Sequence, residues 1–299
     1  YGYEEVDQIY APSGNIAMIR DALNTGRGLL NYTGQGTVST WSTTSFSNAD
    51  IAALTNEGKL PFLCNVACWN GKYAGRTCFA EAWVRSERDG APIGAVAVYM
   101  SSIAQPWRPP MAAQDAIVEL MLAGEPASAA GLCFAGSCAM IDEYGSEGAA
   151  ETSLSWHIFG DPSLLVRTKP PRTMTVEHAG ELPLGAEAYA VTVPGVAGAR
   201  CALWGEGRLL GVAYTDEAGA AELLLDPPPQ TTAPLLLTVV AQDRVAVQEP
   251  VGVLPAPGPY LVPEVAEIAD PAGDGDGRPE SGELIELAIR LRNTGTAAA

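Results

Sequence analysis

Two short stretches of this 299-residue sequence combine glycines with residues that can do chemistry, and each follows an apolar run. Gly34-Gln35-Gly36 follows the run 28–33, and Cys68-Trp69-Asn70-Gly71 follows the run 60–67. A cysteine at the point where a buried strand passes into a loop is partly exposed and close to backbone N–H groups, as a nucleophile must be. Free cysteines are more often inert and buried, so position alone leaves both interpretations of Cys68 open.

These two runs belong to a pattern over residues 1–170 in which strands and helices alternate. The predicted strands are 28–33, 60–67 and 93–100, and the predicted helices are 51–54 (capped by residues 48–50), 78–86 and 111–123. Apolar strands that alternate with helices indicate a mostly parallel sheet covered on both faces. Ligands bind at the carboxyl ends of such strands, so Gln35 and Cys68 are expected to face one cleft.

The sequence pattern changes beyond Lys169: short apolar runs follow one another, separated by Gly, Pro or Asp. Such runs between residues 171 and 254, at spacings of about 8–12 residues, predict an all-β sandwich of immunoglobulin type. A proline-rich linker then leads to the start of a further β module. The expected domains are 1–170, 171–254 and 255–299, with the first incomplete at its N-terminus and the last truncated.

The composition argues against several classes of partner. With 17 basic and 35 acidic residues the net charge is −18, which repels phosphate backbones, so nucleic acid is not an expected partner. No apolar run is long enough for a transmembrane segment.

The six cysteines are irregularly spaced and form no disulfide framework. The pairs Cys64/Cys68 and Cys133/Cys138 lack the tight spacing usual in zinc sites.

The stretch 270–283 carries five carboxylates separated by glycines. Oxygen donors at alternating positions on such a loop can wrap Ca²⁺. Arg278-Pro279 interrupts the run, which departs from the EF-hand pattern, and a solvated turn before a strand is the alternative. The candidate calcium ligands are Asp270, Asp274, Asp276 and Glu283.

Several sequence blocks around these stretches resemble the catalytic domain of the gingipain family of cysteine endopeptidases, which shares a clan with caspases and legumain. The matching blocks include 31–36, 60–62, 66–71, 78–82, 105–111 and 159–168, in the family's order. The resemblance implies a caspase-like α/β sandwich followed by an immunoglobulin-like domain. It also implies a protein or peptide substrate, a secreted or cell-surface location and no required cofactor.

The resemblance also implies roles for individual residues. Cys68 matches the family's nucleophile, and the backbone N–H groups of Cys68 and Gly36 match its oxyanion hole. Trp107 matches the aromatic wall of the pocket for the substrate side chain, with Gln105 on the pocket rim. The family's acidic specificity residue falls before residue 1, which leaves the preference for Arg or Lys open.

The position of the family's catalytic histidine is occupied here by Gln35. Glutamine cannot accept a proton near pH 7, and a positioned general base is worth about 10²–10⁴-fold in rate. His157 and His178 are expected to be structural, since one lies in an apolar stretch and the other in the β region. Two functions stay open: a cysteine endopeptidase, or an inactive homologue that acts as a peptide-binding or surface-adhesion module.

Overall fold

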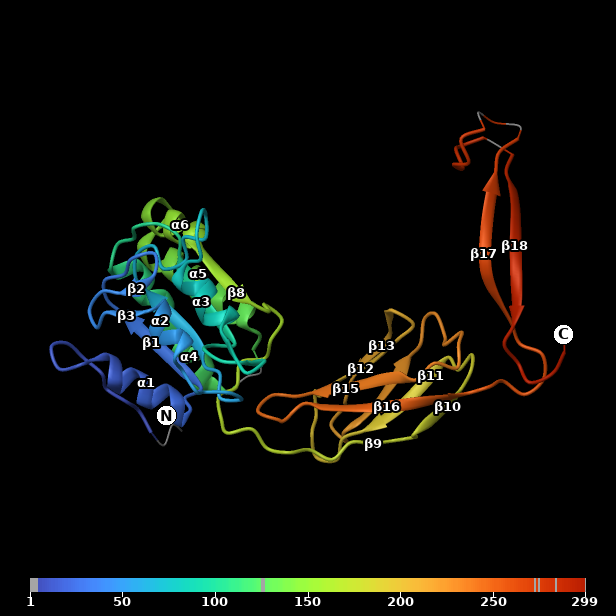
Figure 1. The fold of residues 1–299 in the computed structure, drawn as a ribbon, viewed down its shortest axis with the longest axis horizontal. Coiled ribbons are helices and arrows are strands. Elements are labelled where there is room, and N and C mark those ends of the chain that lie inside the picture. The colour runs from blue at the N-terminus through green and yellow to red at the C-terminus, as the bar shows by residue number, and fades with distance from the viewer. Residues whose placement is uncertain (1–4, 125–126, 272, 274, 283, 299) are drawn as a thin grey trace. The chain divides into compact units, whose positions relative to one another are not determined.

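The computed structural model describes residues 5–124, 127–271, 273, 275–282 and 284–298. Contacts within the chain divide it into two units, Tyr1–Pro171 and Arg172–Ala299. The first unit contains both helices and strands, and the second contains strands (Figure 1).

A four-stranded sheet forms the centre of the first unit. Its strands, in spatial order, are β1 (Leu29–Thr33), β4 (Phe62–Val66), β7 (Ala97–Ser101) and β8 (Trp156–Gly160). The first three strands run parallel, and β8 is antiparallel to β7. Every residue of β4 and β7 is buried, as expected for strands covered on both faces. The predicted mostly parallel sheet is confirmed.

Helices pack on both faces of this sheet (Figure 1). The helices are α1 (Ile16–Thr25), α2 (Asn48–Ala52), α3 (Phe79–Arg85), α4 (Arg108–Ala123), α5 (Ala129–Tyr144) and α6 (Ser146–Ser155). Side chains alternate along a strand, so Leu63 packs with α1, α2 and α3 while Phe62 and Cys64 pack with α4 and α5. None of the helices in the described part of the chain is long and apolar enough to span a membrane.

A small hairpin of β2 (Thr40–Trp41) and β3 (Phe46–Ser47) follows β1 and is fixed to the core by an aromatic cluster. The Trp41 ring stacks on Tyr32 with ring centroids 4.3 Å apart and meets the edge of Phe79 at 5.1 Å. Because Trp41 is buried, the hairpin cannot move without opening the core. A second small hairpin pairs β5 (Glu87–Arg88) with β6 (Ala91–Pro92).

Two boundary predictions were wrong, and each has a physical reason. Residues 48–50 form the first turn of α2, and the N-cap is Ser47, whose N–H and hydroxyl both donate to the Asp50 carboxylate at 2.8 and 2.6 Å. The strand predicted from residue 93 begins only at Ala97, because Gly94 adopts a φ of +93° and exchanges two hydrogen bonds with the Asn56 side chain.

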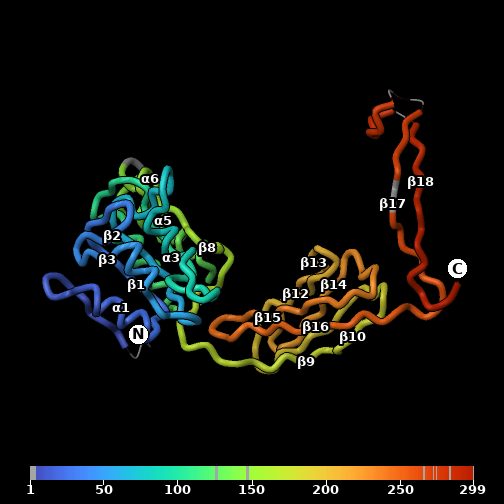
Figure 2. Tube along the Cα trace, viewed as in Figure 1, coloured from blue at the N-terminus to red at the C-terminus, as the bar shows by residue number. Residues whose placement is uncertain are grey.

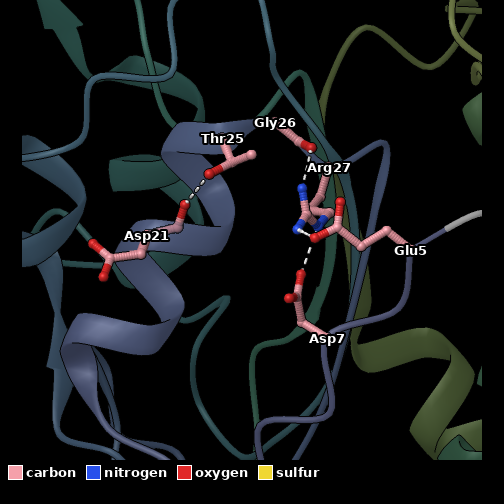
Figure 3. A network of polar contacts seen from close by, with 6 residues as sticks. All are labelled: Glu5, Asp7, Asp21, Thr25, Gly26 and Arg27. Carbon is pink, nitrogen blue, oxygen red and sulfur yellow. Dashed lines mark hydrogen bonds and ion pairs between the residues drawn. The ribbon is translucent and has the colours of Figure 1, made fainter.

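Arg27 joins the N-terminal segment to the turn that feeds β1 into the sheet (Figure 3). Its Nε donates to Asp7 at 2.5 Å, its Nη2 donates to Glu5 at 2.6 Å, and its Nη1 donates to the Gly26 carbonyl at 2.8 Å. The hydrogen bond to Asp7 is the largest of the effects that raise the pKa of the Arg27 guanidinium. The charged cluster thus fixes the point at which the chain enters β1.

Two sheets that share one core make up most of the second unit (Figure 2). The larger sheet has the order β10-β16-β15-β12-β13, and the smaller has the order β14-β11-β9. Val191 and Leu223 of the smaller sheet pack with Cys201 and Leu237 of the larger one. The strands are β9 (Glu177–His178), β10 (Glu181–Pro183), β11 (Ala188–Thr192), β12 (Arg200–Gly205), β13 (Arg208–Tyr214), β14 (Ala220–Leu224), β15 (Leu235–Val240) and β16 (Val247–Leu254).

The chain after this pair of sheets forms a two-stranded antiparallel ribbon (Figure 2). Its strands are β17 (Leu261–Ala269) and β18 (Glu286–Asn293), and the contacts group them with the second unit. The immunoglobulin type of the two sheets and a separate domain at 255–299 stay predictions.

The turn at Gly94 allows a test of the first unit. A Cβ at position 94 would lie 2.3 Å from the Trp83 carbonyl oxygen, at a φ that favours glycine. We expect Gly94→Ala to lower the free energy of unfolding of this unit by about 2 kcal/mol or more in urea denaturation. The matched control is Gly58→Ala, where φ is +67° but the space is open, so only about 1 kcal/mol of strain is expected. Equal losses in the two variants would contradict the packing described for Gly94.

Candidate active site

Cys68 lies two residues beyond the end of β4, at the carboxyl edge of the sheet. The residue is half-buried, and its Sγ accepts a hydrogen bond from the Gln105 backbone N–H at 3.4 Å. The next N–H along the chain, that of Trp69, donates to the Ile103 carbonyl at 3.0 Å. The loop that carries Cys68 is therefore held against the loop that follows β7.

Gly36 lies directly beside Cys68, on the loop that follows β1. A Cβ on Gly36 would come within 2.7 Å of the Cys68 carbonyl oxygen and within 2.9 Å of Asn70 Oδ1, so only glycine fits there. The Gly34 N–H donates to the carbonyl of Val66, the last residue of β4, at 3.1 Å, which continues the pairing one residue past the end of β1. The structure thus brings the two loops singled out in the sequence together.

The backbone N–H groups of Gly36 and Cys68 donate to no acceptor within the described residues. The N–H groups beside them are engaged: Thr37 donates to the Thr40 carbonyl at 3.0 Å, and Trp69 donates to Ile103. An unpaired backbone donor costs free energy unless water or a ligand satisfies it. Unpaired backbone donors can stabilise an oxyanion when they point at the same oxygen, and the oxyanion-hole role of Gly36 and Cys68 stays a prediction.

Gln35 is exposed and precedes Gly36 in the same loop. Its backbone carbonyl accepts hydrogen bonds from the Tyr32 hydroxyl and the Ser42 N–H, each at 2.9 Å. In the part of the chain that the structure describes, no side-chain base is hydrogen-bonded to the Cys68 sulfur. The site is therefore rich in hydrogen-bond donors and lacks a bonded proton acceptor.

Three buried side chains that the sequence analysis did not single out connect the two loops. Trp41 Nε1 donates to Asn65 Oδ1 at 2.6 Å, and Asn65 Nδ2 donates to Asn70 Oδ1 at 3.1 Å. All three residues are almost completely buried. The sequence feature that could have predicted this buried network is Asn65, because an asparagine inside a continuous apolar strand needs buried hydrogen-bond partners.

Gln105 and Trp107 lie on the loop that leads from β7 to α4. The Gln105 side chain accepts a hydrogen bond from Trp156 Nε1, and its Nε2 is buried without a partner in the described chain. Gln105 therefore contacts Cys68 through its backbone. The Trp107 side chain is 46% exposed immediately before α4. The roles predicted for both residues at a substrate pocket stay predictions.

Both histidines have partners other than Cys68. His157 Nε2 lies 3.1 Å from the Ser102 hydroxyl, and its ring meets Tyr73 edge-on at 5.6 Å. His178 belongs to the second unit, where its Nε2 lies 2.7 Å from a Glu249 carboxylate oxygen.

Cys68 differs from most of the other cysteines in its exposure. Cys138 is exposed, and the remaining four thiols are buried. Burial raises the pKa of Cys64 to about 12 and that of Cys201 to about 11, and it also raises the pKa of Cys78 and Cys133. Because the thiolate is the reactive form, these four thiols are expected to be inert.

The predicted calcium loop is organised by its first aspartate. Asp270 is buried, and its two carboxylate oxygens accept hydrogen bonds from the backbone N–H groups of Gly275 and Gly277, each at 3.1 Å. Asp276 accepts from the Arg278 N–H at 2.7 Å, while Asp274 and Glu283 lie outside the described residues. Among the residues that are described, no three His, Cys, Asp or Glu side chains gather as metal ligands, and calcium binding stays a prediction.

Comparison with known sequences identifies relatives of this chain. A model of peptidase family C25 matches residues 2–167. Gingipain R2 of Porphyromonas gingivalis is 35% identical over 279 residues, which make up 92% of this chain and 36% of that protein. Gingipain R1 of the same species is 34% identical over 265 residues, or 87% of this chain and 26% of that protein. The chain thus spans about a third of the length of these relatives or less.

Comparison with solved structures gives the same result. The crystal structure of the Arg-specific cysteine proteinase gingipain R matches with a TM-score of 0.77 at 35% identity, over 85% of this chain and 59% of that chain. The complex of the pro- and mature domains of a Porphyromonas gingivalis gingipain matches with a TM-score of 0.76. This chain therefore belongs to peptidase family C25, the gingipain family of cysteine peptidases.

Proposed function

We propose that this chain is a cysteine endopeptidase in which Cys68 attacks the carbonyl carbon of a peptide bond. The observation that supports this most strongly is the half-buried Cys68 beside two unpaired backbone N–H groups, its own and that of Gly36. Negative charge that develops on the carbonyl oxygen during attack would be stabilised by both donors. Removing one such donor from an enzyme typically costs about 10²–10³-fold in rate.

The proposed reaction has two steps. In the first, a bond forms between Sγ and the carbonyl carbon, the carbon–nitrogen bond breaks, and the thiol proton must reach the departing amine. In the second, water attacks the thioester, which releases the acid and restores the thiol. The Gln105 N–H, 3.4 Å from Sγ, supports the thiolate by hydrogen bonding. Gln35 can donate or accept a hydrogen bond but cannot carry the proton.

The proposed substrate is a peptide with a basic residue before the cleaved bond, and arginine is the first choice. A structurally similar protein is described as Arg-specific, at 35% identity. Lys-gingipain of Porphyromonas gingivalis is 26% identical over 229 residues, which cover 67% of this chain and 13% of that protein. In this proposal the exposed Trp107 packs against the aliphatic part of the basic side chain.

Gln35 supports a second candidate, an inactive homologue that binds peptides or serves as a surface-adhesion module. Without a proton acceptor beside Cys68, the donors of the site would still bind a peptide carbonyl but would not cleave the bond. We further propose a caspase-like arrangement for the first unit, an immunoglobulin-like arrangement for the two sheets, and a secreted or cell-surface location.

The exposure of the thiols gives a first test. We expect iodoacetamide at neutral pH to label Cys68 and Cys138 in the folded chain and to leave the four buried cysteines unlabelled. Peptide mapping by mass spectrometry after timed quenching measures each site separately. Labelling in denaturant serves as the control, since all six thiols should then react. Labelling of Cys64 at the rate of Cys138 would contradict the described core.

A second test supplies the missing base. We expect Gln35→His to raise hydrolysis of an arginine-containing peptide by about 10²-fold or more, because imidazole can accept the thiol proton and pass it to the amine. The variant should also alkylate faster at Cys68 between pH 6 and 7, since an adjacent imidazolium stabilises the thiolate. Gln35→Asn, which keeps an amide, should change neither rate.

The combined outcomes separate the two candidate functions. Faster alkylation together with hydrolysis supports the endopeptidase, provided that Cys68→Ala abolishes the hydrolysis. Faster alkylation without cleavage of arginine or lysine peptides favours the inactive homologue. If neither rate changes, position 35 does not face Cys68, and the proposed catalytic arrangement is wrong.

A further inference from the structure

Asn70 lies between the loop after β1 and the loop after β4, and its side chain is completely buried. Its Nδ2 donates to the carbonyl oxygens of Thr37 and Thr40, at 2.6 and 3.1 Å. Its Oδ1 accepts from Asn65 Nδ2 at 3.1 Å. One side chain therefore ties the segment that follows Gly36 to the segment that carries Cys68.

The orientation of each group in this network is fixed by the chemistry of its partners. Carbonyl oxygens cannot donate, so the Asn70 amide must direct its NH₂ toward Thr37 and Thr40 and its oxygen toward Asn65. Asn65 must then direct its NH₂ toward Asn70, which leaves its oxygen facing the indole N–H of Trp41, a group that only donates. Because only one arrangement satisfies every pair, the buried network holds a single geometry.

The N-terminus of helix α3 is hydrogen-bonded to the same two loops. Its first two N–H groups donate to one carbonyl in each loop, Phe79 to Val38 at 2.7 Å and Ala80 to Asn70 at 3.0 Å. Gly36 fits into the remaining space, with no room for a Cβ between the Cys68 carbonyl and Asn70 Oδ1.

We infer that Asn70 is a positioning residue that fixes the distance between the Gly36 and Cys68 N–H groups. This inference rests on the proposed function, in which the two groups bind one oxyanion. Without the Asn70 side chain, the carbonyls of Thr37 and Thr40 lose their shared donor and the Gly36 loop is released from the Cys68 loop. The sulfur itself keeps its hydrogen bond from Gln105, so its intrinsic reactivity is retained.

The test compares two alkylating probes on Cys68 in a chain that carries Cys138→Ser, which removes the other accessible thiol. Iodoacetamide is small and is not oriented by the site, whereas the peptide part of an arginyl peptide chloromethyl ketone orients the ketone oxygen beside the sulfur. The variant is Asn70→Ala. Its matched control is Asn56→Ala, because Asn56 is equally buried and exchanges two hydrogen bonds with Gly94. Asn56 precedes β4 and Gly94 precedes β7, so this pair lies at the opposite end of the sheet from Cys68.

We expect Asn70→Ala to lower the rate constant for the chloromethyl ketone by about tenfold or more and to change that for iodoacetamide by less than about twofold. Asn56→Ala should change both rate constants by less than about twofold, while its unfolding midpoint falls as it does in Asn70→Ala. Equal loss of the chloromethyl ketone rate in both variants, or equal loss with both probes in Asn70→Ala, would overturn the positioning role.

Failure of the proposed function gives a different result. In that case, the chain with Asn70 intact would itself show no preference for the chloromethyl ketone over iodoacetamide. Hydrogen exchange then decides the positioning role alone, read at the hydrogen-bonded amides next to the two donors, Thr37 and Trp69. Faster exchange of these amides in Asn70→Ala than in Asn56→Ala supports the role, and equal exchange in the two variants overturns it.

Discussion

Thr33 lies opposite Val66 in the parallel pair of β1 and β4, so both strands release the chain at one edge of the sheet. The register is fixed by burial on both faces, since a shift of one residue would move Leu63 from the core of α1, α2 and α3 to the opposite face. Just past the end of β1, the Gly34 N–H still donates to the carbonyl of Val66, the last residue of β4. Gly36 consequently comes to lie beside Cys68, and the other features of the site depend on that contact.

The candidate site is well supplied with hydrogen-bond donors and poor in proton acceptors. The Gln105 N–H donates to the Cys68 sulfur, and the N–H groups of Gly36 and Cys68 have no acceptor among the described residues. No side-chain base in that part of the chain is hydrogen-bonded to the sulfur. Donors stabilise charge but do not move protons. In the proposed function, binding of a peptide carbonyl and cleavage of the peptide bond are therefore separable, so the two candidate functions rest on the same site.

The sequence was sufficient to predict the neighbouring ends of β1 and β4, because continuous apolar runs and the glycines after them are strong local signals. It was also sufficient to predict that residues 171–254 are built of strands. It could not predict the partners of Asn70, since the carbonyls of Thr37 and Thr40 belong to the backbone and have no side-chain signature. The same holds for the Gln105 N–H at Cys68, and for Gly94, whose turn shortens β7.

A crystal structure of the chain after reaction with an arginyl peptide chloromethyl ketone would show whether Gly36 and Cys68 form one oxyanion site. We expect a thioether on Cys68 whose ketone oxygen lies about 3 Å from both the Gly36 and the Cys68 nitrogen atoms. The arginine side chain should contact Trp107. A ketone oxygen that points away from Gly36, or an adduct formed on Cys138 while Cys68 stays unmodified, would show that the two N–H groups do not form such a site.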